Sequence, residues 1–169
     1  MLAYGKVLKA NEDTQEEAIT KLMTGLNICE NSSIFESPSS CRVYKSHFYY
    51  EIGQFFLGSI LSNHNPKKHK NQQTYGQEMK AKAETHLRSS LEIRERENVD
   101  DIDVAECLNS LGLLYFHDES FYEAKKYFER ALIRMNQMKD VVNPIKIINC
   151  MYMKGSACFY LGEYSESCT

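Results

Sequence analysis

Side chains that could transfer protons stand together at one place in the sequence. His117, Asp118 and Glu119 follow one another directly, and an imidazole beside two carboxylates can donate and accept protons near neutral pH. The three residues also form the polar break between two apolar-patterned stretches, where polar side chains are expected in any protein. The sequence contains no phosphate-binding glycine loop and no GxSxG or HExxH pattern. We therefore predict that these residues form a connecting turn and that the chain is not an enzyme.

A second cluster of chemically active side chains lies in a basic stretch at 62–79. Its histidines and lysines are His64, Lys67, Lys68, His69 and Lys70. Because the histidines have no nearby cysteine or third ligand, we expect no zinc site and no other metal or cofactor. The lysines could serve as a docking loop or a nuclear import signal, but the Asn, Gln and Lys content favours a solvated, disordered insertion. Nucleic-acid binding needs a larger basic face with interleaved aromatic residues, so we expect no nucleic-acid partner.

Composition narrows the class of protein further. The chain has 169 residues and a net charge of -3, which gives no bias toward nucleic acid or an anionic membrane. It lacks an apolar run of about 18 residues, so we expect no membrane partner. None of the 6 cysteines has CxxC spacing, and reduced, mostly buried thiols are typical of the cytosol. We predict a single cytoplasmic domain over residues 1–169.

Helical periodicity is clearest at 102–138. One helix face is predicted from apolar or small residues at i, i+3, i+4 and i+7, namely Leu108, Leu111, Gly112 and Tyr115. A second helix is predicted from two small residues on either side of a large one, namely Ala124, Phe128 and Ala131. Small residues let two helix axes approach closely, and the aromatic ring fills the space beside them. The sequence therefore predicts a tight pair of helices.

Three helix starts are predicted from capping signals. Ser120 with Glu123, and Thr14 with Glu17, have the spacing of a capping box. Asn143–Pro144 has an N-cap residue followed by proline at the first helical position, where its missing N–H costs nothing.

The pattern of 102–138 recurs elsewhere in the chain. Gly155 and Gly162 follow Gly112 and Glu119 at a spacing of 43 residues, and Cys150 follows Cys107 at the same spacing. Upstream, Gly53 takes the position of Gly112, while Ala83, Leu87 and Ser90 take those of the second helix. The predicted units are 1–32 (a degenerate helical unit), 43–97 (a repeat with the basic insertion at 62–79), 102–138 (the best repeat) and 144–169 (an incomplete repeat).

The repeated residues resemble the tetratricopeptide repeat family. The resemblance rests on a Leu-Gly pair, an aromatic residue and spaced Ala, aromatic and Ala residues, here Leu111, Gly112, Tyr115, Ala124, Phe128 and Ala131. Kinesin light chain and nephrocystin-type repeats are closest in unit spacing. The resemblance implies an all-α solenoid of helical hairpins in a right-handed superhelix. The sequence ends at Thr169 within an expected second helix, so we expect a truncated last repeat and, through it, possible self-association.

The resemblance also implies where a partner binds. First helices of such repeats line a concave groove, and an asparagine at the position of Asn109 commonly binds a peptide backbone in this family. By repeat register the groove candidates are Tyr50, Gln54, Glu106, Asn109, Leu113, Phe116, Asn149, Tyr152, Ser156 and Phe159, with His47 beside them. The alternative, that these are ordinary helix-surface residues, stays open.

The expected function is a non-catalytic scaffold or adaptor that binds a peptide or helix of a partner protein in this groove. Two other functions are compatible with the sequence. One is a regulatory or sensing segment of a larger enzyme or ATPase, and the other is an oligomerisation module.

Overall fold

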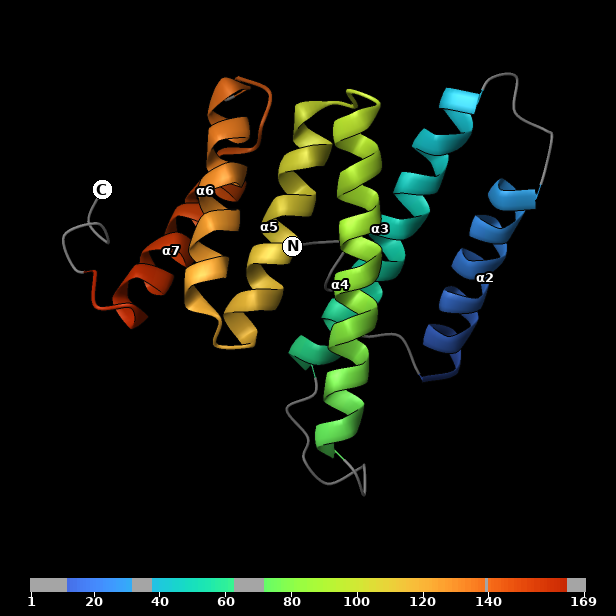
Figure 1. Ribbon diagram of the computed structural model, residues 1–169, viewed down its shortest axis with the longest axis horizontal. Coiled ribbons are helices and arrows are strands. Elements are labelled where there is room, and N and C mark those ends of the chain that lie inside the picture. Colours follow the sequence, from blue (N-terminus) through green and yellow to red (C-terminus); the bar gives the residue numbers. More distant parts are fainter. Residues whose placement is uncertain (1–11, 32–37, 63–71, 139, 164–169) are drawn as a thin grey trace. The chain divides into compact units, whose positions relative to one another are not determined.

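The computed structural model describes residues 12–31, 38–62, 72–138 and 140–163. Within these residues it contains helices and no strand (Figure 1). The helices are α2 (Glu12–Asn31), α3 (Pro38–Ser62), α4 (Gln72–Arg96), α5 (Asp101–His117), α6 (Phe121–Gln137) and α7 (Pro144–Tyr160). The predicted all-α helical-repeat fold is confirmed. The chain divides after Ile93 into two compact units, which are described separately.

In the C-terminal unit, α5 and α6 form an antiparallel hairpin with a very close helix contact (Figure 1). A Cβ atom at Gly112 would stand 2.6 Å from Cε1 of Phe128, which is closer than real Cβ contacts. Leu108 and Leu111, on the same side of α5, are buried. Glycine is therefore needed at position 112 because the Phe128 ring occupies the space of a side chain. The close approach predicted from sequence is confirmed.

The buried face of α6 follows the predicted small–large–small pattern. Ala124, Phe128 and Ala131 are all fully buried. Beside them, the ring of Tyr127 stacks on that of Tyr115, with centroids 5.4 Å apart and planes 4° from parallel. Offset stacking of this kind adds about 0.5–1.5 kcal/mol beyond area burial. The hairpin is thus closed by an apolar stripe with an aromatic pair along its border.

The turns after α5 and α7 have the same backbone. Glu119 and Gly162, which are equivalent by register, both have positive φ angles, of 59° and 77°. The N–H of Ser120 donates to the carbonyl of Tyr115 at 2.9 Å, and the N–H of Glu163 donates to that of Cys158 at 2.9 Å. Asp118 and Glu119 form the connecting turn, as predicted, whereas His117 is the last residue of α5; all three are exposed.

The second helix of the hairpin begins where predicted, with Ser120 at its N-cap position, but the predicted Ser120–Glu123 capping box is wrong. The Ser120 side chain makes no capping hydrogen bond, and its hydroxyl instead donates to a carboxylate oxygen of Asp118 at 3.1 Å. The Thr14–Glu17 box is also wrong as a helix start, because α2 is already helical at Glu12.

Glu119→Gly is expected to stabilise the protein. A left-handed backbone costs an L-residue about 1–2 kcal/mol, and the larger chain entropy of unfolded glycine cancels part of the gain. We therefore expect the free energy of unfolding to rise by about 0.5–1 kcal/mol, measured by urea denaturation with circular dichroism. Gly162→Glu, the reverse change in the equivalent turn, should lower it by a similar amount. A loss of stability in Glu119→Gly would contradict this explanation of the turn.

The start of α7 confirms the third capping prediction. The N–H of Ile145 donates to Oδ1 of Asn143 at 3.0 Å, and Pro144 occupies the first helical position. A side-chain cap of this kind contributes about 1 kcal/mol. Local sequence alone is therefore sufficient to start this helix.

In the N-terminal unit, α3 and α4 repeat the α5–α6 contact with different side chains. A Cβ atom at Gly53 would stand 2.7 Å from Cγ of Leu87, so Leu87 takes the place that Phe128 has over Gly112. The hydroxyl of Ser90 donates to the carbonyl of Ser46 at 2.7 Å, and both residues are fully buried. This hydrogen bond explains how a serine is accommodated at a position where the next repeat has Ala131.

The stretch expected as a disordered insertion is partly helical. α3 continues to Ser62 and α4 begins at Gln72, so both helices have 25 residues where α5, α6 and α7 have 17. The first buried residue of α4 is Met79, and its early turns extend past the end of α3 (Figure 1). His64, Lys67, Lys68, His69 and Lys70 lie outside the described residues.

α2 packs on α3 through another glycine. A Cβ atom at Gly25 would overlap the ring of Phe48. Leu26 and Cys29, on the same helix, are buried. The thiol of Cys41 donates to the carbonyl of Cys29 at 3.1 Å. The close-contact role assigned to glycines in the repeats thus extends to the first described helix.

Candidate functional site

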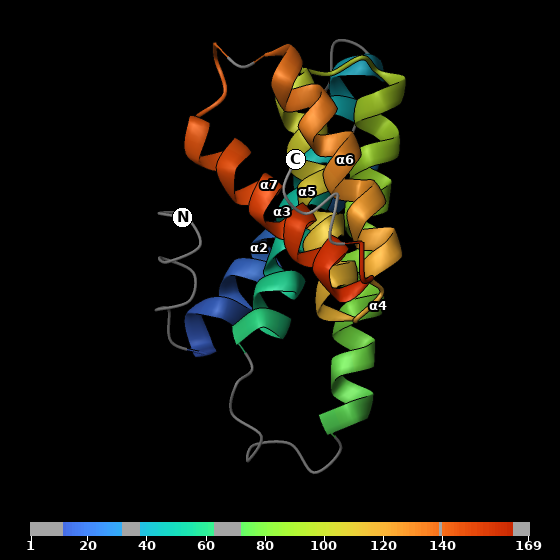
Figure 2. The same ribbon diagram turned by 90° about the vertical axis from the view of Figure 1, so that its left-hand side faces the viewer.

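Most of the predicted groove residues lie on two helices of the C-terminal unit that contact each other, α5 and α7. We call this surface the α5–α7 face. It consists of Glu106, Asn109, Leu113 and Phe116 from α5 and Asn149, Tyr152, Ser156 and Phe159 from α7. Residues spaced by three or four positions share one side of a helix, and α7 runs obliquely to α5 in Figure 2. The structure therefore gathers these eight candidates on adjoining elements.

An ion pair joins the two helices at one end of the face. The ammonium group of Lys146, in the first turn of α7, donates to a carboxylate oxygen of Glu106 on α5. Both side chains are partly exposed. An exposed pair contributes at most about 1 kcal/mol, so a partner's charge could replace either member at little cost.

Aromatic rings join the helices at the other end. Phe116 of α5 lies edge-to-face against Tyr160 of α7, with centroids 5.8 Å apart. Phe121, at the start of α6, stacks on Tyr160 at 4.5 Å and contacts Phe116 at 5.4 Å. Phe159 also packs edge-to-face against Tyr160, at 5.8 Å. We call these four rings the aromatic cluster, and it leaves Phe159 and Tyr160 largely exposed.

Between the ion pair and the aromatic cluster, the face is polar and accessible. Within the described residues, the amide of half-buried Asn109 makes no hydrogen bond, so both its donor and acceptor groups are available. Tyr152 is 72% exposed, and the hydroxyl of Ser156 donates to its carbonyl at 2.9 Å. Leu113 is half-buried on α5. This combination offers hydrogen bonds to a backbone and apolar contacts to side chains.

Three further candidates belong to the other compact unit. His47, Tyr50 and Gln54 lie on α3, where Tyr50 and Gln54 are half-buried and His47 is exposed. Their spacing places them on one side of that helix. Their participation in a common groove with α5 and α7 stays a prediction.

Sequence reasoning missed three residues that shape the α5–α7 face. Lys146 pairs with Glu106, while Tyr160 and Phe121 complete the aromatic cluster. The neighbouring residues Phe159 and Tyr160 were a usable signal of a ring contact. Adjacent residues point in different directions around a helix, so both rings cannot point straight away from the protein. No local pattern predicts the ion pair, because its members are 40 residues apart.

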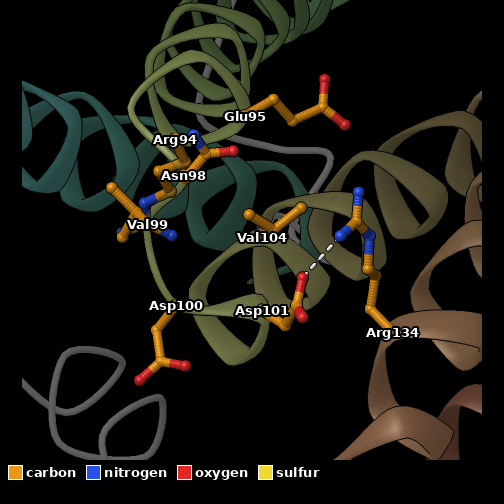
Figure 3. A pocket seen from close by; sticks show the side chains of 8 residues that line it. All are labelled: Arg94, Glu95, Asn98, Val99, Asp100, Asp101, Val104 and Arg134. Atoms are coloured by element: carbon orange, nitrogen blue, oxygen red, sulfur yellow. Dashed lines mark hydrogen bonds and ion pairs between the residues drawn. The ribbon is translucent and has the colours of Figure 1, made fainter.

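A surface cavity of about 350 Å³ lies in the C-terminal unit near the end of α4 and the start of α5 (Figure 3). It is lined by Arg94, Glu95, Asn98, Val99, Asp100, Asp101, Val104 and Arg134. Buried Arg94 donates to the carbonyl of Asp103 at 2.7 Å and to the thiol sulfur of Cys107 at 3.2 Å. Arg134 donates to a carboxylate oxygen of Asp101 at 2.5 Å, as the dashed line in Figure 3 shows.

These contacts explain the charges around the cavity. Within this unit, Arg94 in the last turn of α4 is bound to α5, and Arg134 connects the last turn of α6 to the first turn of α5. A third arginine, Arg130, pairs with Glu95 at 2.9 Å. The charged groups of the cavity are thus used to connect helices.

The buried thiols of the described residues show no feature of a nucleophile. Four of the five described cysteines are buried, and burial raises the pKa of Cys150 to about 12. Its thiol therefore stays protonated at neutral pH and donates to the carbonyl of Phe128 at 3.6 Å.

The described residues contain no group of three or more His, Cys, Asp or Glu side chains that could hold a metal ion. Among the helices α2 to α7, none combines the length and apolar character that crossing a membrane requires.

One comparison with known proteins gives a match. The family model of the tetratricopeptide repeat matches residues 104–137, which include nearly all of α5 and the whole of α6. No curated protein and no solved structure matches the chain at a significant level. The match coincides with the best repeat of the sequence and with the hairpin in which Phe128 covers Gly112.

Proposed function

Because the chain carries a tetratricopeptide repeat in residues 104–137, a repeat that points to protein–protein interaction, we propose that it is a non-catalytic adaptor. Its ligand is an extended peptide segment of a partner protein, bound on the α5–α7 face. The buried, reduced thiols support a cytoplasmic location as part of this proposal.

The observation that carries the proposal is the available amide of Asn109 on the same α5–α7 face as exposed aromatic side chains. An extended peptide presents N–H and C=O groups along its backbone, and a carboxamide can bind one of each. Tyr152 and Phe159 supply rigid apolar area at low entropic cost, as binding surfaces often do. Such a surface can recognise both the backbone and the side chains of a peptide.

The two ends of the face suggest features of the ligand. An apolar or aromatic side chain of the peptide would contact the aromatic cluster, because its exposed rings at Phe159 and Tyr160 are otherwise in water. A charged side chain at the other end of the peptide would meet Lys146 or Glu106. We therefore expect ligands with an apolar anchor and a charge several residues away.

Replacing Asn109 and Tyr152 by alanine should abolish most partner binding. The double variant removes the Asn109 carboxamide, which binds the backbone of the peptide in this proposal, and the ring of Tyr152, which is 72% exposed. Loss of two contacts of this kind weakens binding about tenfold or more. The measurement is quantitative affinity capture followed by mass spectrometry, with circular dichroism to show that the helices remain.

A matched control is available on α6. Tyr122 is also a largely exposed tyrosine, 57% accessible, but it lies outside the α5–α7 face. Tyr122→Ala should retain the partners that the double variant loses. If the double variant captures the same partners as the unchanged protein, in the same amounts, the proposed binding face is wrong.

A further inference from the structure

Two cysteine residues meet where the end of α2 packs on the start of α3. Cys29 lies in the last turn of α2, and Cys41 lies in the first turn of α3. The two helices contact each other within the N-terminal unit (Figure 1). The thiol of Cys41 donates to the carbonyl oxygen of Cys29 at 3.1 Å, although the residues are 12 positions apart. We call these two residues the cysteine pair.

This hydrogen bond limits the distance between the two side chains. A carbonyl oxygen lies about 2.4 Å from the Cα atom of its own residue, so Sγ of Cys41 is at most about 5.5 Å from Cα of Cys29. The side chain of Cys29 starts from that Cα atom, and only the rotation about its Cα–Cβ bond decides where its sulfur points. The cysteine pair therefore has the proximity that a disulfide requires.

The two thiols of the pair differ in their surroundings. Cys29 is 5% exposed, whereas Cys41 is partly exposed. Burial raises the pKa of the Cys29 thiol above its usual value, and the nearby Cys41 and Glu30 raise this pKa further, while Lys45 lowers it. Cys29 therefore stays protonated at neutral pH, and an oxidant dissolved in water reaches Cys41 first.

Accessibility sets Cys41 apart from the other described cysteines. The sulfur of Cys107 accepts a hydrogen bond from Arg94 at 3.2 Å, and the thiol of Cys150 donates to the carbonyl of Phe128 at 3.6 Å. These two residues and Cys158 are at most 1% exposed. Among the five described cysteines, Cys41 is thus the one that is not buried.

We propose that a peroxide oxidises the cysteine pair to a reversible disulfide, which ties α2 to α3. The Cys41 thiolate attacks one oxygen of hydrogen peroxide, the O–O bond breaks, and water leaves as the sulfur becomes a sulfenic acid. The sulfur of Cys29 then attacks that of Cys41, so that the S–S bond forms and the S–O bond breaks. The departing hydroxide takes the proton of the Cys29 thiol, and two thiols with one peroxide have given a disulfide and two waters.

The disulfide would reinforce a helix contact that is otherwise non-covalent. α2 is held on α3 by the Phe48 ring at Gly25 and by the hydroxyl of Tyr49, which donates to a carboxylate oxygen of Glu30 at 3.2 Å. A covalent link between the two helices restricts the unfolded chain and so opposes unfolding. Oxidation should therefore raise the urea midpoint of the protein, and an excess of a small thiol should reverse the change. Disulfides of intracellular proteins are usually transient and redox-sensing in this way.

The test treats the purified full chain with hydrogen peroxide, blocks the remaining thiols and measures intact mass and peptide maps. We expect the loss of two hydrogen atoms, a linked peptide that contains Cys29 and Cys41, and recovery of the original mass with dithiothreitol. The proposal is overturned if no disulfide forms, if other cysteines are linked, or if the bond joins two copies of the chain.

Single variants test the order of the two steps. In Cys29→Ser, Cys41 should accumulate as a sulfenic acid that dimedone traps, because no second thiol resolves it. In Cys41→Ser, Cys29 should stay reduced, because it is buried. Labelling of Cys29 in Cys41→Ser, at the rate at which Cys41 is labelled in Cys29→Ser, would contradict the assignment of Cys41 as the first site.

Urea unfolding of the same proteins tests the link between the helices. Peroxide should raise the midpoint of the unchanged protein and of the control Cys168→Ser, which removes a cysteine outside the described residues. It should not change the midpoint of Cys41→Ser, whose partly exposed position keeps the test valid if Cys29→Ser does not fold. An oxidised protein that unfolds at the same urea concentration as the reduced one would show that the disulfide does not tie α2 to α3.

Discussion

Phe128→Ala is expected to lower the free energy of unfolding by about 3–5 kcal/mol, the range measured for emptying a buried phenylalanine site. The ring is fully buried and lies against Gly112, where no other side chain can expand to fill the space. A domain of this size has a total stability of about 5–15 kcal/mol, so the loss is a large part of it. Urea denaturation followed by circular dichroism measures the change.

A milder variant keeps this prediction testable if Phe128→Ala does not fold. Phe128→Leu reproduces the contact that Leu87 makes with Gly53 in the N-terminal unit, and it should cost less than about 1.5 kcal/mol. Tyr122→Ala, at an exposed position of the same helix, should change stability by less than about 0.5 kcal/mol. Equal effects of Phe128→Ala and Tyr122→Ala would show that the ring is not the centre of this core.

The second large effect is a reversal of sign at Gly112. In the unchanged protein, Gly112→Ala should be destabilising by about 1–2 kcal/mol, because overpacking against Phe128 outweighs the better helix propensity of alanine. In a Phe128→Ala background, the same substitution should be stabilising by about 1 kcal/mol, since the new methyl group enters the cavity and the propensity gain remains. The coupling between the two sites is then about 2–3 kcal/mol.

The control for this cycle is another helical glycine. Nothing lies within 4 Å of a Cβ atom built at Gly58, so Gly58→Ala should be stabilising by about 0.5–1 kcal/mol in either background. If Gly112→Ala behaves like Gly58→Ala in the unchanged protein, the close contact between Gly112 and Phe128 does not constrain the hairpin. Thermal and urea unfolding of the four cycle members and the two controls measure these effects.

The features predicted correctly from sequence are those that depend on periodicity and on neighbours along the chain. The pairing of Gly112 with Phe128 and of Gly53 with Leu87 follows from one repeated pattern, because a missing side chain and a large one must be juxtaposed for two helices to touch. The Asn143 cap was predicted for a similar reason, since the cap and its N–H partner are two residues apart.

The features that escaped prediction depend on side-chain orientation or on distance. The hydroxyl of Ser120 donates to the carboxylate of Asp118, and its oxygen does not accept from the backbone of the next helix. The Lys146–Glu106 pair joins side chains of two different repeats, and its formation depends on how α7 lies against α5. In the stretch 62–79, low apolar content indicated disorder, yet the residues from Gln72 onward extend a helix whose later turns are well packed.

The buried pair Ser46 and Ser90 has a consequence for how repeats of this kind are recognised. The hydroxyls of Ser46 and Ser90 donate to the carbonyls of Val43 and Ser46, so both serines are satisfied at the buried positions that Ala105 and Ala131 occupy in the next hairpin. The buried contact thus involves hydroxyl groups in one hairpin and methyl groups in the other. A family model that scores residue types loses score at such a position, although Leu87 still covers Gly53 in that hairpin. A small polar residue whose hydrogen bond is made within the contact can therefore stand where the repeat pattern expects alanine.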